Sequence, residues 1–330
     1  MNQLKPGYEK ISHHIEHLVR QPWLAKSQEF WPRYLFHFTD ITNAGHILAN
    51  DILHCREILE NSGPSFIDIA GPQIIKETPQ IWKQYVRLYF RPRTPMQYRN
   101  EGIRPKEKLE LDAHCPVPVI LVFDAKKILT LQTTQFSNGN LRANRVKVSG
   151  DTDFYLNLPF EKIYHDSGLH QLNEDEKREI IFHRHAEVII PKEMDLTGLR
   201  YIFCRSHAEF ETLINLLPSR KRIKWRYFIR IEPTLFFKDW FFVKKASLNS
   251  SSVTFSISTV HGPSSFHARV EIEHPETKEK YSWQEQNYNP KEILTFNLSN
   301  LSHPDYYKIS FYLDNHLAYQ NIYRDESGIF

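Results

Sequence analysis

The stretch YVRLYFRPRTPMQY, residues 85–98, is the most informative part of the sequence. Its aromatic and apolar residues predict a β-strand over residues 85–90, and two prolines fix the conformation of the loop that follows. Tyr89 offers a ring face to a planar ligand, and Arg91 and Arg93 offer guanidinium groups to phosphate. The stretch is therefore either a ligand-binding strand and loop or a solvated basic turn.

Two further segments place polar groups at the ends of apolar runs. In FHFTD, residues 36–40, His37 carries an imidazole and Thr39 a hydroxyl. These groups either contact a ligand or are half-buried with their hydrogen bonds satisfied within the protein. In RHAEVII, residues 184–190, Glu187 stands near the start of an otherwise apolar strand. Because a buried charge is costly unless it is paired or used, Glu187 is either a catalytic carboxylate or an edge residue that faces water.

Mixed helices and strands are predicted from the amino terminus to about residue 235. Residues 117–123 form a continuous apolar run that predicts a strand buried on both faces, whereas glycines and prolines predict a long loop over residues 61–80. Helices are predicted over residues 8–20, after an N-cap at Thr42, after the capping box of Asn173 with Glu176, and after that of Ser206 with Glu209.

The pattern changes after residue 240, where short alternating strands replace the helices. Val253, Phe255 and Ile257 alternate with polar residues, and similar runs recur to give about seven strands separated by turn residues. The predicted fold class is α+β: a first domain over residues 1–235 with helices flanking a sheet, followed by an all-β sandwich over residues 240–330. No polar constellation stands out in the sandwich, which favours a partner- or target-docking role for it.

Composition and charge exclude several classes of protein. The 330 residues are 41% hydrophobic and 13% aromatic, which is too apolar for a disordered chain. Three separate cysteines without a C-x-x-C pair argue against disulfides and a thiolate metal site, and His13 and His17 lack a third ligand, so no metal is expected. Without an apolar signal core or membrane segment, we expect a cytoplasmic protein.

Nucleic-acid binding would have to come from local clusters, because the net charge is only +3. Basic residues interleave with aromatic ones over residues 83–108 and 220–230. Such segments are typical of surfaces that hold single strands, whose phosphates need charge and whose bases stack, but a generically basic surface has the same composition.

Taken together and in this order, FHFTDITNAGHIL, YVRLYFRPRTPMQY and RHAEVII resemble the hallmark segments of the DarT family of DNA ADP-ribosyltransferase toxins. The resemblance covers residues 34–230. It implies an ADP-ribosyltransferase fold, with a split β-sheet core and NAD⁺ bound in its cleft as co-substrate.

The resemblance also implies roles for individual residues. Glu187 would be the catalytic glutamate, with Arg93 supporting the site. The family has an arginine in the loop before the second segment, where this chain offers Lys76, a point charge without the planar guanidinium fork. The residues implied to contact NAD⁺ are His37, Thr39, Asn43, Tyr89 and Met96. Those expected to contact nucleic acid are Arg91, Arg99, Arg184, Lys224 and Arg226.

The function implied is transfer of ADP-ribose from NAD⁺ to a nucleobase of single-stranded nucleic acid, foremost DNA. The enzyme would act as a toxin or anti-phage effector with a cognate antitoxin as partner. Two alternatives stay open at this point: the same transfer onto single-stranded RNA, and a catalytically idle binding module on the same fold.

Overall fold

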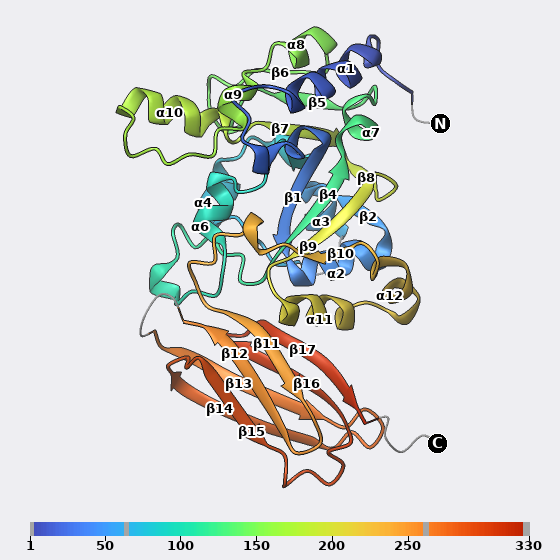
Figure 1. Ribbon diagram of the computed structural model, residues 1–330, viewed down its shortest axis with the longest axis vertical. Coiled ribbons are helices and arrows are strands. Elements are labelled where there is room, and N and C mark those ends of the chain that lie inside the picture. The colour runs from blue at the N-terminus through green and yellow to red at the C-terminus, as the bar shows by residue number, and fades with distance from the viewer. Residues whose placement is uncertain (1–2, 63–65, 260–263, 326–330) are drawn as a thin grey trace.

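A computed structural model describes residues 3–62, 66–259 and 264–325 of the chain, and Figure 1 shows its two parts. The first part surrounds a mixed sheet with helices, and the second is a pair of packed sheets. This α+β arrangement followed by an all-β sandwich agrees with the predicted fold class.

The main sheet has eight strands in the order β10-β9-β4-β1-β3-β7-β5-β6. All neighbouring strands are antiparallel except β10 and β9, which are parallel. The central strands β1 and β3 share one registered residue pair, Phe36 with Tyr89. The sheet therefore consists of two four-stranded halves joined at a narrow contact. The bounds are β1 (Tyr34–Asp40), β3 (Tyr85–Tyr89), β4 (Pro118–Asp124), β5 (Gln135–Ser137), β6 (Val148–Ser149), β7 (Glu187–Pro191), β9 (Leu199–Cys204) and β10 (Ile229–Ile231).

Helices and a small second sheet cover the main sheet. The α-helices are α1 (Tyr8–Val19), α2 (Ile41–Asn50), α3 (Arg56–Ser62), α4 (Pro72–Glu77), α5 (Gln80–Lys83), α6 (Pro95–Asn100), α7 (Ala125–Leu129), α8 (Thr152–Leu156), α9 (Phe160–Ile163), α10 (Glu174–His183), α11 (His207–Leu216) and α12 (Ser219–Trp225). The 3-10 helices are η1 (Lys26–Gln28), η2 (Trp31–Arg33), η3 (Lys106–Lys108) and η4 (Pro233–Leu235). Strands β2 (Ile52–His54) and β8 (Glu193–Asp195) pair to form the small sheet.

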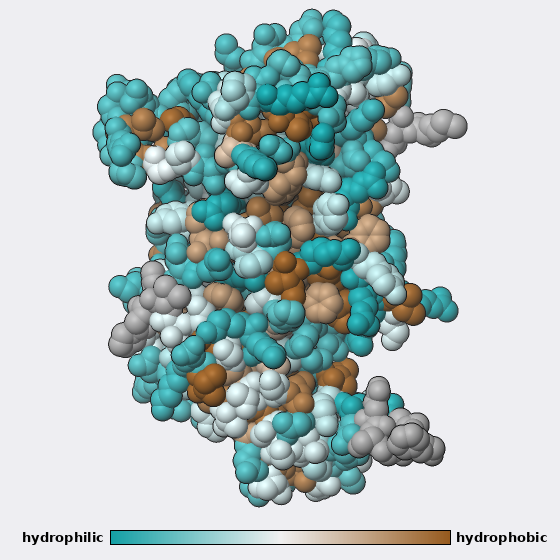
Figure 2. All heavy atoms as spheres, viewed as in Figure 1, coloured by the Kyte–Doolittle hydropathy of each residue, from teal (hydrophilic) through white to brown (hydrophobic). Residues whose placement is uncertain are grey.

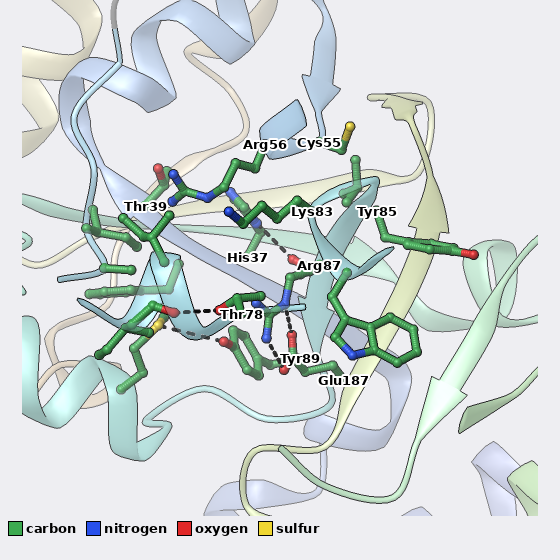
Figure 3. Close-up of a pocket in the computed structure, with 18 of the residues that line it drawn as sticks. His37, Thr39, Cys55, Arg56, Thr78, Lys83, Tyr85, Arg87, Tyr89 and Glu187 are labelled. Atoms are coloured by element: carbon green, nitrogen blue, oxygen red, sulfur yellow. Dashed lines mark hydrogen bonds and ion pairs between the residues drawn. The ribbon is translucent and has the colours of Figure 1, made fainter. Parts of the chain in front are cut away.

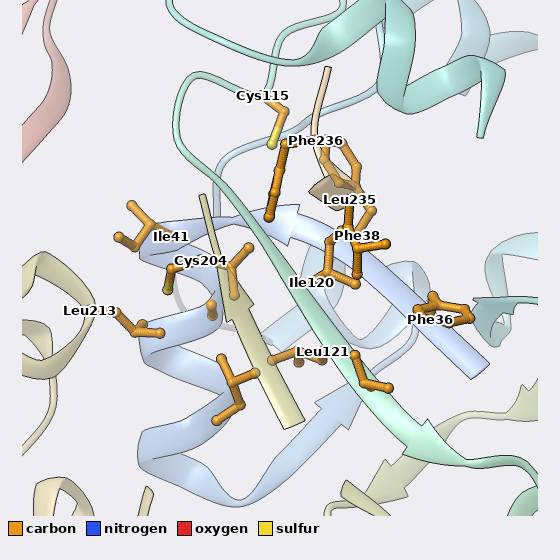
Figure 4. Close-up of a cluster of buried hydrophobic side chains, with 14 of the residues drawn as sticks. Phe36, Phe38, Ile41, Cys115, Ile120, Leu121, Cys204, Leu213, Leu235 and Phe236 are labelled. Carbon is orange, nitrogen blue, oxygen red and sulfur yellow. The ribbon is translucent and has the colours of Figure 1, made fainter. Parts of the chain in front are cut away.

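The core of the first part lies around β4, the strand predicted to be buried on both faces. Residues 118–123 are all buried, as that prediction requires. Figure 4 shows side chains of β1, β4 and β9 packed against α2, α11 and the segment after η4. Burial of this apolar surface holds the half-sheet rigid, so that the ends of its strands are well placed to carry a site.

Seven strands of residues 242–324 form the sandwich, as the alternation predicted. Its sheets have the orders β11-β12-β15 and β14-β13-β16-β17, and Phe255 stacks on Phe311 between them with ring centroids 5.0 Å apart. The bounds are β11 (Phe242–Leu248), β12 (Ser252–Ser258), β13 (Phe266–Glu273), β14 (Lys280–Tyr288), β15 (Ile293–Asn297), β16 (Tyr306–Leu313) and β17 (His316–Arg324).

Helix α11 joins the sandwich to the first part through specific polar contacts. Ser206 Oγ donates to the carbonyl of Val243 at 2.7 Å, and the hydroxyl of Tyr319 donates to Glu211 at 2.6 Å. Beside this contact Arg205 is fully buried between the carboxylates of Glu101 and Glu209. The two parts are therefore packed on each other by contacts that exclude water.

Local signals located several elements correctly and misplaced others. The capping box of Asn173 with Glu176 opens α10 as predicted. The N-cap of α2 is Asp40 and not Thr42, because the Asp40 carboxylate accepts from the backbone N–H of Thr42 at 2.9 Å. The loop predicted over residues 61–80 contains α4, and α5 begins at its end. The proline-rich loop after β3 continues into α6, capped by Thr94.

Hydrophilic side chains cover most of the face shown in Figure 2, and hydrophobic ones appear there in separate patches. In the described part of the chain, no helix combines the length and the apolar character needed to span a bilayer.

Candidate active site

A cleft of about 1140 Å³ opens beside the contact between the two half-sheets. Its walls come from β1, α2, β2 and α3 on one side and from β3, α10 and β7 on the other. The volume exceeds the roughly 300–1,000 Å³ of an ordinary small-molecule site, which leaves room for more than one ligand. Across residues 3–62, 66–259 and 264–325, no group of three or more His, Cys, Asp or Glu residues is placed to hold a metal ion.

Glu187 lies in this cleft at the start of β7, and its carboxylate is paired with the guanidinium of Arg87 (Figure 3). The contact is bidentate: Nε of Arg87 donates to one carboxylate oxygen and Nη2 donates to the other. Tyr89 is registered opposite Glu187 and Arg87 opposite Ile189, so Arg87 reaches its partner diagonally across the strand pair. The fork fixes both the position and the rotation of the carboxylate.

The pair is buried on one side and open on the other. The side chain of Glu187 is 1% exposed and that of Arg87 is 31% exposed. Burial by itself lowers the pKa of Arg87, but the charge of Glu187 and its hydrogen bonds outweigh burial and raise the pKa above its ordinary value. Arg87 therefore stays charged and holds a positive group at the cleft surface beside the carboxylate.

Tyr89 forms the adjoining wall. Burial, and then the charge of Glu187, raise the pKa of Tyr89 above its ordinary value, so its hydroxyl stays protonated. That hydroxyl lies 3.8 Å from the sulfur of Met96, a residue in the first turn of α6. The ring and the thioether together give an apolar, polarisable surface suited to a flat aromatic ligand.

His37 enters the cleft from β1. Its Nδ1 lies 3.0 Å from the carbonyl of Arg87, and burial lowers the pKa of the imidazole, so the ring is neutral near pH 7. Since a carbonyl only accepts, Nδ1 carries the proton and Nε2 is left as the acceptor. His37 thus bridges the two half-sheets and keeps one acceptor for a ligand.

Asn43, on α2, organises the floor next to His37. Its Nδ2 donates to Thr39 Oγ1 at 3.2 Å and to the carbonyl of Ile67 at 2.8 Å, while its Oδ1 accepts from the N–H of Ile67 at 2.8 Å. These bonds hold the segment before α4 against α2. Five predicted cofactor contacts, together with Glu187, therefore line one cleft: His37, Thr39, Asn43, Tyr89 and Met96.

Six residues predicted for the site lie outside the cleft lining, and two of them, Lys76 and Arg93, were predicted to act beside Glu187. Lys76 is exposed on α4, and the helix presents Ile74 and Ile75 to the cleft instead. Arg93 has a left-handed φ of 56° and donates to the carbonyls of Thr234 and Phe236, so it fastens the loop before α6 to the segment around η4. Neither side chain lines the cleft together with Glu187.

Arg91 and Arg184, predicted to contact nucleic acid, are both engaged by the segment after α9, Arg91 as a buried residue and Arg184 as a partly exposed one. Arg91 is 1% exposed, pairs with Asp166 and donates to the carbonyl of His165. Arg184 donates to the carbonyl of Ser167 at 2.6 Å, and its guanidinium contacts the His165 ring. Both arginines anchor the segment after α9, and the burial of Arg91 removes it from any strand that binds at the surface.

The remaining predicted nucleic-acid residues are on the surface. Arg99 lines the cleft with a 59% exposed side chain. Lys224 and Arg226 lie at the end of α12, outside the cleft lining; both are exposed, and Lys224 pairs with Asp51 at 2.8 Å. Of these three residues, Arg99 lies in the cleft, whereas Lys224 and Arg226 belong to a separate basic surface.

Sequence reasoning missed Arg87, the cation nearest to Glu187. Strand alternation places Arg87 on the same face as Tyr89, so the prediction that Tyr89 faces the ligand already contained the signal. Other basic residues that line the cleft were also missed, because they converge from distant segments: Arg56, Arg142, Arg145 and Arg178. Lys83 lines the cleft as well and belongs to the basic stretch predicted over residues 83–108.

The family described as ssDNA thymidine ADP-ribosyltransferase, DarT, matches residues 36–242, more than half of the chain, and the chain therefore belongs to this family. The matched region contains the whole of both half-sheets except the first two residues of β1. None of the curated proteins compared with the chain matches it significantly in sequence.

Several solved structures are similar to this chain over somewhat less than two thirds of its length. Thermus sp. 2.9 DarT in complex with ADP-ribosylated ssDNA is 18% identical, with a TM-score of 0.48 over 62% of this chain and 97% of that chain. The NAD⁺ complex of the same Thermus protein is 17% identical, with a TM-score of 0.47 over 62% and 98%. Thermosipho africanus DarTG in complex with ADP-ribose is 17% identical, with a TM-score of 0.47 over 66% and 54%.

Proposed function

We propose that the protein transfers ADP-ribose from NAD⁺ to a thymidine base of single-stranded DNA, with Glu187 as the catalytic carboxylate. The single observation that carries this proposal is the oriented, buried carboxylate of Glu187 at the wall of a cleft that also holds His37 and Tyr89. Membership of the DarT family supplies the reaction and the substrate class.

We assign the two half-sheets to the split sheet of the ADP-ribosyltransferase fold. The single residue pair between β1 and β3 is the narrow contact that such a split core would have. We likewise keep residues 1–235 as the catalytic domain and residues 240–330 as the accessory domain. The β11 strand at Phe242 begins where the family match ends, which supports this division.

The residues fit cleavage of the bond between nicotinamide and ribose. As that bond breaks, its electron pair leaves with the nicotinamide and positive charge develops on the ribose, as in glycoside cleavage. A fixed carboxylate in a partly desolvated cleft stabilises that charge. The attacking ring nitrogen of thymine must lose its proton, and Glu187 is the group placed to accept it.

Arg87 has a positioning role in this scheme. The guanidinium occupies one lone-pair site on each carboxylate oxygen, and a carboxylate offers about four such sites, so Glu187 can still accept from a substrate. The fork thereby holds the carboxylate in one orientation at the cleft wall, where it can face both the developing cation and the proton to be removed.

His37, Thr39, Asn43, Tyr89 and Met96 are the proposed NAD⁺ contacts. The free acceptor Nε2 of His37 suits the N–H of a carboxamide, and the Tyr89 and Met96 surface suits the face of a nicotinamide ring. Lys83 supplies positive charge in the same cleft for phosphates, whereas the guanidinium of Arg56 is paired with Asp68.

Arg99, Arg142, Arg145 and Arg178 form the basic rim that we propose for the DNA strand. Phosphates bind such cations without regard to sequence, while the target base enters the cleft unpaired. The partner that would restrain the enzyme is a cognate antitoxin, as the family resemblance implies.

The test is to incubate the protein with labelled NAD⁺ and matched DNA and RNA oligonucleotides of one sequence, with thymidine replaced by uridine in the RNA. We expect label on DNA that contains thymidine. Label on RNA alone would replace DNA with RNA as the substrate, and label on neither would favour an idle binding module.

A further inference from the structure

A second basic surface lies on α12, away from the cleft. We define the α12 surface as the exposed side chains Arg220, Ile223, Lys224, Arg226 and Tyr227. Ile223 is 74% exposed and Tyr227 is 75% exposed. They are four residues apart in a backbone that stays helical through Arg226, so they lie on one side of the helix.

The helix that carries this surface is rigidly held. Trp225 is buried, and its Nε1 donates to the carbonyl of Leu48 in α2 at 2.9 Å. Lys221 and Lys224 both reach the carboxylate of Asp51, each at 2.8 Å. The exposed tyrosine and arginines are therefore presented from a fixed base and need little ordering when a ligand binds.

The charge of the α12 surface is not compensated within the protein. Asp51 neutralises one of the two lysines, and among the described residues no carboxylate pairs with Arg220 or Arg226. Two free guanidinium groups next to an exposed tyrosine ring match a ligand that carries both phosphates and flat bases.

Lys224 links the α12 surface to the edge of the cleft through its ion pair with Asp51. Asp51 is the C-cap of α2, and its neighbours Asn50 and Ile52 both line the cleft. A strand whose target base is in the cleft can therefore leave over the C-terminal end of α2 and reach α12. In Figure 1, α12 lies beside α11 at one side of the molecule, clear of the sandwich strands.

We propose that the α12 surface is an accessory site for single-stranded DNA, which binds the substrate several nucleotides from the modified base. Arg220 and Arg226 contact phosphates, and Tyr227 stacks on a base. This inference rests on the proposed function, because it extends the substrate site of the same enzyme.

The test compares a short thymidine oligonucleotide of about 4 nucleotides with one of about 16, lengths that span the usual range of single-strand sites. The variant is R220Q/R226Q/Y227A, and the charge-matched control is K126Q/K127Q on α7, where both lysines are exposed. We expect the variant to raise KM for the long substrate about tenfold or more and to leave KM for the short one within about twofold. The control should change neither value.

Salt dependence gives a second readout. Loss of two phosphate contacts should reduce the slope of log KM against log salt for the long substrate by about 1.4, at about 0.7 per contact on a single strand. An unchanged KM and slope for the long substrate would overturn the accessory site and leave the surface to another partner, such as a protein. If the wild-type protein modified neither oligonucleotide, the proposed function itself would fail, and the two failures are thereby distinguished.

Discussion

Two buried arginine–carboxylate clusters in this protein have opposite surroundings. Arg205 pairs with Glu101 and Glu209 beside the sandwich, with side chains that are 0%, 2% and 1% exposed. Arg87 pairs with Glu187 at the cleft and keeps 31% of its side chain exposed. The same chemical pair is closed off in one place and open to a ligand in the other.

The partners of the two clusters differ as much as their exposure does. Glu101 also accepts from the backbone N–H groups of Phe237 and Lys238, and Glu209 also accepts from that of Arg205, so protein donors satisfy these carboxylates. Among the described residues, Arg87 is the only one that donates hydrogen bonds to the carboxylate of Glu187. Burial of a charge therefore does not by itself mark a site, whereas a carboxylate with unused acceptor sites at a cleft does.

The largest expected effect on stability is at the closed cluster. Glu209→Ala leaves the buried Arg205 with Glu101 as its carboxylate partner, at 3.5 Å. We expect the free energy of unfolding to fall by about 3–5 kcal/mol. Chemical denaturation measures this loss. Turnover per folded molecule should stay close to that of the wild type, and a specific loss of turnover at full stability would break the distinction between the clusters.

Asp40 is a fourth buried carboxylate, and no cation among the described residues pairs with it, so its titration isolates the effect of burial. Burial raises the pKa of Asp40 to about 6, although the N–H groups of Thr42 and Val117 oppose the rise. The folded state therefore holds this proton more tightly than the unfolded state. The resulting stability is complete below about pH 4 and is lost as the pH rises through about 6.

Asp40→Asn keeps an acceptor for the N-cap and removes the titration. We expect the stability of the wild type relative to this variant to fall by up to about 3 kcal/mol between pH 4 and pH 7. Denaturant melts of both proteins at several pH values measure it. A constant difference across that range would contradict the assigned cause.

Arg87→Gln should change catalysis more than stability, because the side chain is partly solvated. We expect turnover to fall by about 10–100-fold with little change in KM for NAD⁺. Arg87→Lys should recover only part of the lost turnover, because a lysine keeps the charge but lacks the fork that orients the carboxylate. Turnover of Arg87→Gln and Arg87→Lys equal to that of the wild type would reduce Arg87 to a structural residue.

The smallest effect is expected for Lys76→Ala. Lys76 is exposed on α4 and outside the cleft lining, so turnover should stay within about twofold of wild type. Loss of turnover on the scale of Arg87→Gln would restore Lys76 as the basic partner that the family pattern implied.

The parts of the fold that depend on short stretches of sequence were predictable. The capping box at Asn173, the buried strand β4 and the seven sandwich strands all follow from local patterns. The register between β3 and β7 was not predictable, because it joins residues about 100 positions apart. For that reason Glu187 and Tyr89 could be singled out separately, while the pairing of Arg87 with Glu187 could not.

The misplaced residues share a physical cause. Arg91 and Arg93 follow β3 closely in a basic segment, but their neighbours in space are Asp166 and the segment around η4. A run of positive charge in a sequence does not reveal which members meet a carboxylate elsewhere in the chain. Whether each arginine is solvated or buried therefore depends on the partners that the folded chain brings to it.

The most direct test of the central claim is mass spectrometry of a single-stranded oligonucleotide with one thymidine after incubation with NAD⁺. We predict that the wild-type protein adds one ADP-ribose to that thymidine. Glu187→Gln should reduce the rate by about 10²–10³-fold while the thermal unfolding transition stays within a few degrees. A folded Glu187→Gln protein that modifies the oligonucleotide at the wild-type rate would contradict the assignment of Glu187 as the catalytic carboxylate.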